Sequence, residues 1–142
     1  MEFISNSLED TFLLASHIAK QCNGGEIILL NGDLGAGKTT FTKGFAKALG
    51  ITNAVTSPTF TLMKTYHGRL RLYHFDMYRI IDEGEVEELG FEDNLGDEEA
   101  VCIIEWNKFS DLHGKIIKIN IEYLGESQRK FDIEGIDETF SN

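Results

Sequence analysis

The sequence predicts an α/β fold with a mixed β-sheet that has parallel strands at its centre, antiparallel additions and helices on both faces. Two observations carry this prediction. Residues 27–31 form a continuous apolar run of strand length, which opens into glycines and is followed by a helical pattern. Residues 100–105 form a second apolar run of similar length. Such uninterrupted runs are typical of parallel strands that are covered on both faces.

Two helices are predicted from apolar residues at spacings of three and four. The first runs from about Ser7 to Cys22, and one of its faces carries Leu8, Phe12, Ala15 and Ala19. The second runs from Lys38 to Leu49, where Gly50 can end it in a left-handed conformation. Its apolar face consists of Phe41, Phe45 and Leu49.

The antiparallel additions come from the middle and the C-terminal part of the chain. Residues 61–66 and 70–75 are strand-like runs around His67-Gly68, which predicts a hairpin. Apolar residues alternate with polar ones in 117–123 and again near 131–133, which indicates half-exposed strands. The acidic stretch 82–95 predicts a short helix with loops, and the tail after Gly135 is expected to be loose.

Length and composition favour one domain over residues 1–142. The chain is 42% hydrophobic and holds one proline, with no linker-like or low-complexity stretch. No apolar run approaches the roughly 20 residues that a membrane span requires, and the first residues do not fit a signal peptide. Cys22 and Cys102 are too few for a disulfide framework, so we expect reduced structural thiols and a cytoplasmic location.

The net charge of −11 limits the partners that the chain can bind unaided. Lys and Arg total 13 against 24 Asp and Glu. A protein that binds nucleic acid by itself neutralises several phosphates with a basic face. We therefore expect tRNA or DNA to be repelled, so that any nucleic-acid role requires a basic partner.

One motif carries explicit chemistry, and it spans Gly32-Asp33-Leu34-Gly35-Ala36-Gly37-Lys38-Thr39. It satisfies the GxxxxGK[ST] pattern between a predicted strand and a predicted helix, as a P-loop requires. Backbone N–H groups of such a loop surround the β-phosphate, and the helix N-terminus adds its positive dipole end. Lys38 would reach the β- and γ-phosphates, and Thr39 would offer its hydroxyl to Mg²⁺. The sequence thus predicts a P-loop NTPase fold that binds ATP with Mg²⁺.

Acidic residues at strand ends are candidates for the metal and for catalysis. Glu105 ends the buried run 100–105, so its carboxylate should emerge at the carboxyl edge of the sheet. Asp76 ends another run, although an aspartate there can equally be a turn residue. His74 has no Cys or His at metal spacing and is interpreted as structural. Trp106 can belong to the core or border the nucleotide, and its position alone leaves both open.

Taken together, the motifs resemble the bacterial TsaE (YjeE) family, the small ATPase of the machinery that makes threonylcarbamoyladenosine in tRNA. The resemblance covers about residues 5–123 and follows the family's order. Its motifs are Gly32 to Thr40, Ser57-Pro58-Thr59-Phe60-Thr61-Leu62, His74-Phe75-Asp76-Met77-Tyr78-Arg79, Glu88-Leu89-Gly90 and Ile104-Glu105-Trp106. The chain departs from the family after Trp106, where Asn107-Lys108 replace an expected proline, small or acidic residue.

The resemblance implies roles for individual residues. Thr39 and Glu105 would hold Mg²⁺, Asp76 would be needed for hydrolysis, Thr59 would lie in a switch-like loop, and Leu8 would lie beside the adenine. The nucleotide-binding set comprises Leu8, Asp33, Leu34, Gly35, Ala36, Gly37, Lys38, Thr39 and Thr40. The resemblance further implies that the chain hydrolyses ATP slowly alone and acts on the TsaB and TsaD proteins. Contact with tRNA would come only through that complex, for tRNAs that read codons beginning with A.

Two other classes of protein share parts of this pattern. A P-loop small-molecule kinase would need an acceptor pocket and usually a lid with arginines, and none of the four arginines lies in an obvious lid. A GTPase-like switch is suggested by Asn107-Lys108-Phe109-Ser110-Asp111, which resembles a guanine-reading NKxD sequence. The aspartate lies one residue too late for that motif.

Overall fold

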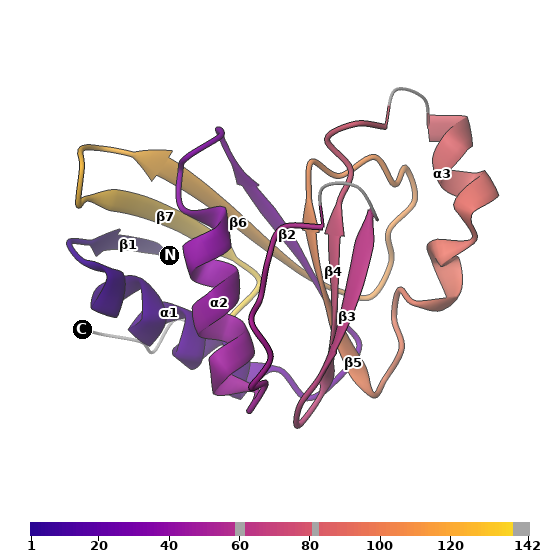
Figure 1. Ribbon diagram of the computed structural model, residues 1–142, viewed down its shortest axis with the longest axis horizontal. Coiled ribbons are helices and arrows are strands. Elements are labelled where there is room, and N and C mark those ends of the chain that lie inside the picture. The colour runs from indigo at the N-terminus through magenta and orange to yellow at the C-terminus, as the bar shows by residue number, and fades with distance from the viewer. Residues whose placement is uncertain (59–61, 81–82, 138–142) are drawn as a thin grey trace.

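The computed structural model describes residues 1–58, 62–80 and 83–137. Seven strands form one sheet in the order β1-β7-β6-β2-β5-β4-β3 (Figure 1). The strands are β1 (Glu2–Ser5), β2 (Glu26–Gly32), β3 (Met63–His67), β4 (Arg71–Asp76), β5 (Ala100–Glu105), β6 (Lys115–Tyr123) and β7 (Arg129–Glu134). The helices are α1 (Leu8–Gln21), α2 (Lys38–Ala48), α3 (Glu83–Leu89) and the 3₁₀ helix η1 (Phe91–Asp93).

The sheet confirms the predicted mixed topology. Strands β6, β2, β5 and β4 are parallel neighbours, so their carboxyl ends meet at one edge. β3 pairs with β4 in the predicted antiparallel hairpin, and β7 pairs antiparallel with β6. In this register Leu30 lies opposite Glu105, and Glu105 lies opposite Asp76. The two candidate acids therefore come from neighbouring strands at the same level.

Helices α1 and α2 pack side by side and cover the same face of the sheet (Figure 1). Their contact is close, because a Cβ atom added to Gly44 of α2 would lie 2.7 Å from Cδ1 of Phe12 and 3.1 Å from its Cα. The opposite face is covered by short elements, and Phe75 of β4 packs its ring against Phe91 of η1 and Phe109 of the loop between β5 and β6. Helical structure thus lies on both faces, but the long helices share one.

Two details differ from the sequence prediction. The buried side of α1 consists of Thr11, Leu14, Ala15, Ile18 and Ala19, whereas Leu8 is 63% exposed. Of the predicted apolar face, Ala15 and Ala19 are buried and Phe12 packs against Gly44 of α2, whereas Leu8 belongs to the first turn and lies beyond the edge of the core. Strand β1 was not predicted at all, since its four residues are too few for a periodic pattern.

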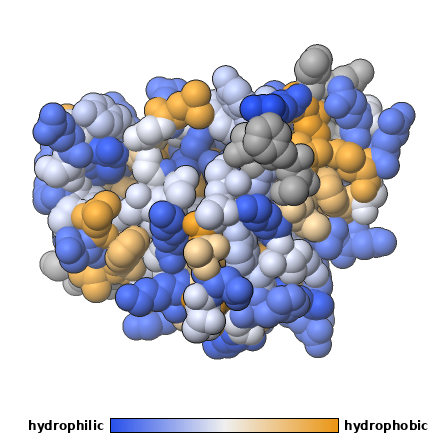
Figure 2. Space-filling model, viewed as in Figure 1, coloured by the Kyte–Doolittle hydropathy of each residue, from blue (hydrophilic) through white to orange (hydrophobic). Residues whose placement is uncertain are grey.

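Two further predictions concern the thiols and membrane-spanning segments. Cys22 and Cys102 are free and buried as predicted, and burial raises the pKa of each thiol to about 12. In the part of the chain that the structure describes, no helix is both long and apolar enough to cross a membrane. Hydrophilic side chains cover most of the face shown in Figure 2, with apolar patches near α1, over the β2–α2 loop and near α3.

Candidate nucleotide-binding site

The β2–α2 loop has the backbone geometry of an anion-binding loop. Gly35 and Gly37 have φ angles of 81° and 112°, in the left-handed region that a side chain would strain. Gly37 is the N-cap of α2, and no side chain caps the helix there. The first N–H groups of α2 therefore remain available to an anion, and the helix dipole favours negative charge at this point.

Lys38 occupies the centre of this site, and its side chain is only 6% exposed. Its Nζ donates to the carbonyl oxygen of Gly32 at 2.6 Å and lies 3.9 Å from Oε1 of Glu105. The same ammonium lies 4.0 Å from the centroid of the Trp106 ring. Burial lowers the pKa of Lys38, while Glu105, Asp76 and Asp33 act in the opposite direction. The cation is thus desolvated and surrounded by acids.

Glu105 is buried and contacts nitrogen atoms on two sides. Oε1 faces Lys38, and Oε2 lies 2.6 Å from Nε2 of His74, which is 1% exposed. An ordinary solvated acid, the alternative that the sequence left open for Glu105, does not describe this carboxylate. The structural interpretation of His74 gains a specific contact, because its imidazole touches a candidate metal ligand.

Asp76 lies next to this pair at a half-exposed position. Its Oδ2 accepts from the Ser57 hydroxyl at 3.4 Å, and its Oδ1 accepts from the backbone N–H of Tyr78 at 3.0 Å. The second contact is that of a turn residue, which the sequence had allowed. Asp76 also lines a cavity of about 240 Å³ together with Leu34, Ser57, Tyr78, Arg79 and Trp106. Asp76 therefore lines a cavity that also borders the P-loop at Leu34.

Trp106 borders the site instead of belonging to the core. Its φ of 54° is unusual for a bulky residue and marks local strain directly after β5. The ring covers the Lys38 ammonium and lies 5.0 Å from the ring of Tyr78. It lines both the cavity beside Asp76 and a smaller one of about 150 Å³ beside Lys38 and Asp33.

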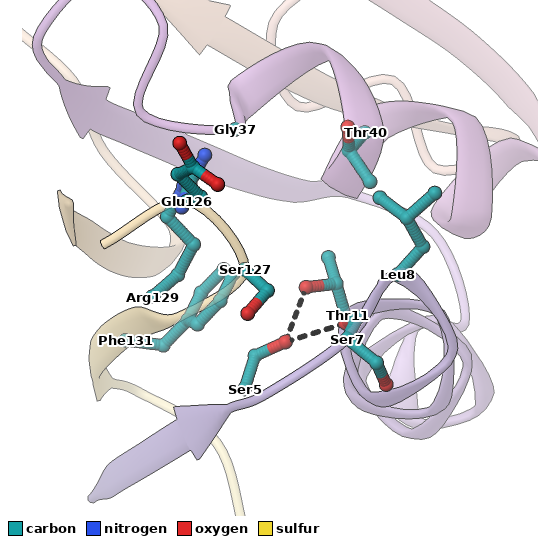
Figure 3. A pocket seen from close by; sticks show the side chains of 10 residues that line it. All are labelled: Ser5, Ser7, Leu8, Thr11, Gly37, Thr40, Glu126, Ser127, Arg129 and Phe131. Atoms are coloured by element: carbon teal, nitrogen blue, oxygen red, sulfur yellow. Dashed lines mark hydrogen bonds between the residues drawn. The ribbon is translucent and has the colours of Figure 1, made fainter. Parts of the chain in front are cut away.

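A separate cavity of about 310 Å³ lies on the other side of the P-loop (Figure 3). Leu8 of α1 points into it, opposite Gly37 and Thr40 at the start of α2. Ser5 forms part of its floor, where its hydroxyl lies 2.7 Å from the hydroxyl of Thr11. The structure thus brings Leu8 and Thr40 together, although they are 32 residues apart in the sequence.

Arg129 is a site residue that the sequence analysis missed. Its Nε donates to the carbonyl oxygen of Ala36 at 2.9 Å, and Nη1 donates to Gly125 at 2.6 Å. The guanidinium also lies 4.5 Å from the centroid of the Tyr123 ring. Arg129 therefore ties the β6–β7 turn to the P-loop and lines the same cavity as Leu8. Only the pairing of β7 beside β6 brings it there, and a lone arginine after a turn carries no sequence signal.

The remaining candidates are placed as follows. Asp33, Leu34 and Thr39 are exposed, and Thr39 lies in the first turn of α2. Thr59 lies outside the described residues. The amide of Asn107 is occupied locally, because Oδ1 accepts from the N–H of Phe109 and Nδ2 donates to its carbonyl oxygen. This arrangement does not favour the reading of a guanine base by Asn107.

The fold and the loop define the class: this is an α/β protein with a P-loop between a central parallel strand and a helix. The sequence matches the family described as threonylcarbamoyl adenosine biosynthesis protein TsaE over residues 5–131, and the chain belongs to this family. The TsaE of Aquifex aeolicus is 44% identical over 93% of this chain and 94% of its own length. The TsaE of Bacillus subtilis is 42% identical over 90% of this chain and 81% of its own length.

A solved structure supports the same assignment. The crystal structure of Bacillus subtilis YdiB is similar with a TM-score of 0.76 and 36% sequence identity. The match covers 92% of this chain and 82% of that one. This likeness confirms the predicted α/β fold, and the family membership confirms the resemblance found in the motifs.

Proposed function

We propose that this chain binds ATP with Mg²⁺ at the carboxyl edge of the parallel strands and hydrolyses it in support of threonylcarbamoyladenosine formation in tRNA. The observation that carries the proposal is the buried Lys38 ammonium at the N-terminus of α2, next to the Glu105 carboxylate. The names of the relatives supply the process, because they are described as tRNA threonylcarbamoyladenosine biosynthesis proteins.

Phosphate binding follows from the contacts of Lys38. Its ammonium now donates to the Gly32 carbonyl oxygen and lies against the Trp106 ring. A triphosphate offers negatively charged oxygens in place of a neutral carbonyl oxygen and an aromatic ring, so the Coulomb attraction between opposite charges is added to the hydrogen bond. Binding of the phosphates would therefore draw Lys38 away from Gly32 and Trp106.

The metal chemistry fits the oxygen donors at this edge. Mg²⁺ is usually held by one or two protein oxygens together with substrate phosphates and water. Thr39 provides a hydroxyl on the first turn of α2, and Glu105 provides a carboxylate fixed beside Lys38. The ion would neutralise charge that develops on the phosphates. Asp76, one strand further, would orient the attacking water.

The cavity beside Leu8 is the candidate site for the base. Its volume of about 310 Å³ matches the lower end of small-molecule pockets, and Phe131 and Leu8 give it apolar walls. Thr40 and Gly37 at its rim continue the P-loop. A base in this cavity and phosphates at the α2 N-terminus would belong to one nucleotide, for which we propose ATP.

The TsaB and TsaD proteins are the proposed partners, and tRNA would be reached only through them. The net charge of −11 opposes unaided tRNA binding. Three arginines are held by other groups: Arg69 by carbonyl oxygens of Ala19 and Cys22, Arg71 by Asp97 and Arg129 by Ala36. Arg79 lines the cavity beside Asp76, and a partner can add further positive charge at the transition state, an effect worth about 10³ to 10⁵ in rate elsewhere.

Reconstitution tests the proposal. TsaB, TsaD, tRNA and the substrates of the modification are combined with and without this chain, and the modified nucleoside is quantified together with phosphate release. We expect modification to require this chain and ATP, and phosphate release to be slow without TsaB–TsaD. Fast ATP turnover alone, tight tRNA binding by the isolated chain, or phosphate transfer to a small acceptor would contradict the proposal. The last result would indicate a small-molecule kinase.

A further inference from the structure

His74 contacts Glu105 but has no role of its own in the proposed phosphate binding, metal binding or hydrolysis. Both side chains are buried, with 1% of His74 and 5% of Glu105 exposed, and the Nε2–Oε2 distance is 2.6 Å. Nδ1 of His74 is buried as well and has no hydrogen-bond partner in the described part of the chain. A buried polar atom without a partner is costly, and the contact at Nε2 is the favourable polar interaction of this ring that offsets that cost.

The two oxygens of the Glu105 carboxylate contact different side chains, and the contact with His74 is the shorter one. His74 lies on β4, and Glu105 ends the neighbouring strand β5. The Glu105 carboxylate thus meets His74 through Oε2 and Lys38 through Oε1. The Lys38 contact is long, at 3.9 Å, and it is the one that is released when Lys38 turns to a phosphate. The His74 contact is shorter, and it comes from a strand that stays in the sheet.

We propose that His74 is a positioning residue: its Nε2–H holds Oε2 of Glu105, so that Oε1, which faces Lys38 in this structure, would be available to the metal ion once Lys38 moves to the nucleotide. A carboxylate oxygen that is ionised only accepts hydrogen bonds, so the proton of the pair lies on Nε2. Partners of this kind typically contribute 10-fold to 100-fold to metal affinity or activity. The inference rests on the proposed function, because it assigns His74 a task at that metal site.

The experiment measures Mn²⁺ binding to the full chain in complex with ADP, by electron paramagnetic resonance of free Mn²⁺. His74→Leu removes the donor and keeps an apolar side chain of similar size, whereas His74→Gln keeps an N–H donor. We expect Mn²⁺ affinity to fall about tenfold in His74→Leu and to return to within about threefold of the unmodified chain in His74→Gln. ADP affinity in the presence of EDTA should change less than twofold in both variants.

A matched control separates positioning from general loosening of the strand. Leu72 lies two residues earlier on β4 and is fully buried in the helix-covered core, among apolar side chains. Leu72→Ala should lower the free energy of unfolding by about 2–5 kcal/mol and leave Mn²⁺ affinity within twofold. Equal losses of Mn²⁺ affinity in Leu72→Ala and His74→Leu would overturn the inference.

A double-mutant cycle with Glu105→Gln tests whether His74 affects Mn²⁺ affinity through Glu105. If His74 acts through Glu105, adding His74→Leu to Glu105→Gln should lower Mn²⁺ affinity no further. An undiminished tenfold loss in that background, or unchanged affinity in His74→Leu alone, overturns the inference. If His74→Leu does not fold, ¹⁵N spectra of the unmodified chain still test the inference, because they show which ring nitrogen of His74 carries the proton. A proton on Nε2 supports the inference. A neutral ring that is protonated at Nδ1 overturns it. Failure of the unmodified ADP complex to bind Mn²⁺ would instead overturn the proposed function.

Discussion

Two buried glutamates lie at opposite ends of the parallel strands, and their partners differ in kind. Glu26 begins β2 and is 6% exposed, and its oxygens accept from the backbone N–H groups of Asn23 at 2.9 Å and Gly24 at 2.8 Å. Glu105 ends β5 and is 5% exposed, but its oxygens meet the side chains of His74 and Lys38. The two glutamates are thus the same type of residue and are buried to nearly the same extent, and they differ in their partners.

The difference lies in whether the partners can leave. The two N–H groups belong to the backbone of the turn that precedes β2, so they cannot turn to another partner as a long side chain can, and Glu26 stabilises that turn. Lys38 has a flexible stem and can exchange its partner for a phosphate. A buried charge therefore indicates function when its partners are movable side chains at the carboxyl edge, and structure when they are backbone groups at the amino edge.

The strongest test exchanges each glutamate for the neutral isostere. Glu105→Gln should keep the fold but lower ATP hydrolysis about 10²-fold or more, because it removes charge at the place proposed for the metal and the attacking water. Glu26→Gln should leave hydrolysis unchanged and lower the free energy of unfolding by about 1–3 kcal/mol, since an NH₂ group would face a backbone donor. Phosphate release with partners present and urea denaturation measure the two quantities. Equal behaviour of the variants would break the comparison.

A second test concerns the turn that Glu26 supports. Gly24 has a φ of 117°, and an added Cβ would lie 1.8 Å from the carbonyl oxygen of Glu98. Gly96 has a similar φ of 77°, but nothing lies within 4 Å of its added Cβ. Gly24→Ala should therefore lower the free energy of unfolding by about 3 kcal/mol or more, and Gly96→Ala by about 1 kcal/mol. Similar losses in urea denaturation would show that the close approach at Gly24 is relieved cheaply.

A third test addresses the movable partner. Lys38→Ala removes the side-chain cation of the phosphate site, and charge-assisted hydrogen bonds contribute about 1.5–3 kcal/mol. Affinity for ATP with Mg²⁺, measured by calorimetric titration, should fall roughly tenfold or more. Lys43→Ala provides the control, because Lys43 is exposed on the same helix. An unchanged dissociation constant for Lys38→Ala would remove Lys38 from the site.

The sequence predicts most of the fold and those parts of the candidate site that are contiguous in the chain or that follow a buried strand. The runs that became β2 and β5 are buried on both faces, so their composition alone marks them. The P-loop is a contiguous motif, and Glu105 follows a buried strand. Arg129 and the contact between His74 and Glu105 could not be predicted, because they arise from strand pairing between segments distant in the sequence.

The smallest expected effect concerns the protonation of Lys38. Burial lowers the pKa of this ammonium, so the folded chain binds its proton less tightly than the unfolded chain, whose lysine keeps the ordinary value of 10.5. Between the lowered pKa and 10.5 the unfolded state therefore holds more protons, and the contribution of Lys38 to the free energy of unfolding rises with pH. Lys38→Met removes this contribution. We expect the free energy difference between the unmodified chain and Lys38→Met to increase from pH 8 to pH 10 in favour of the unmodified chain, measured by urea denaturation at each pH. A difference that stays flat or decreases would show that the neighbouring acids offset the burial of Lys38.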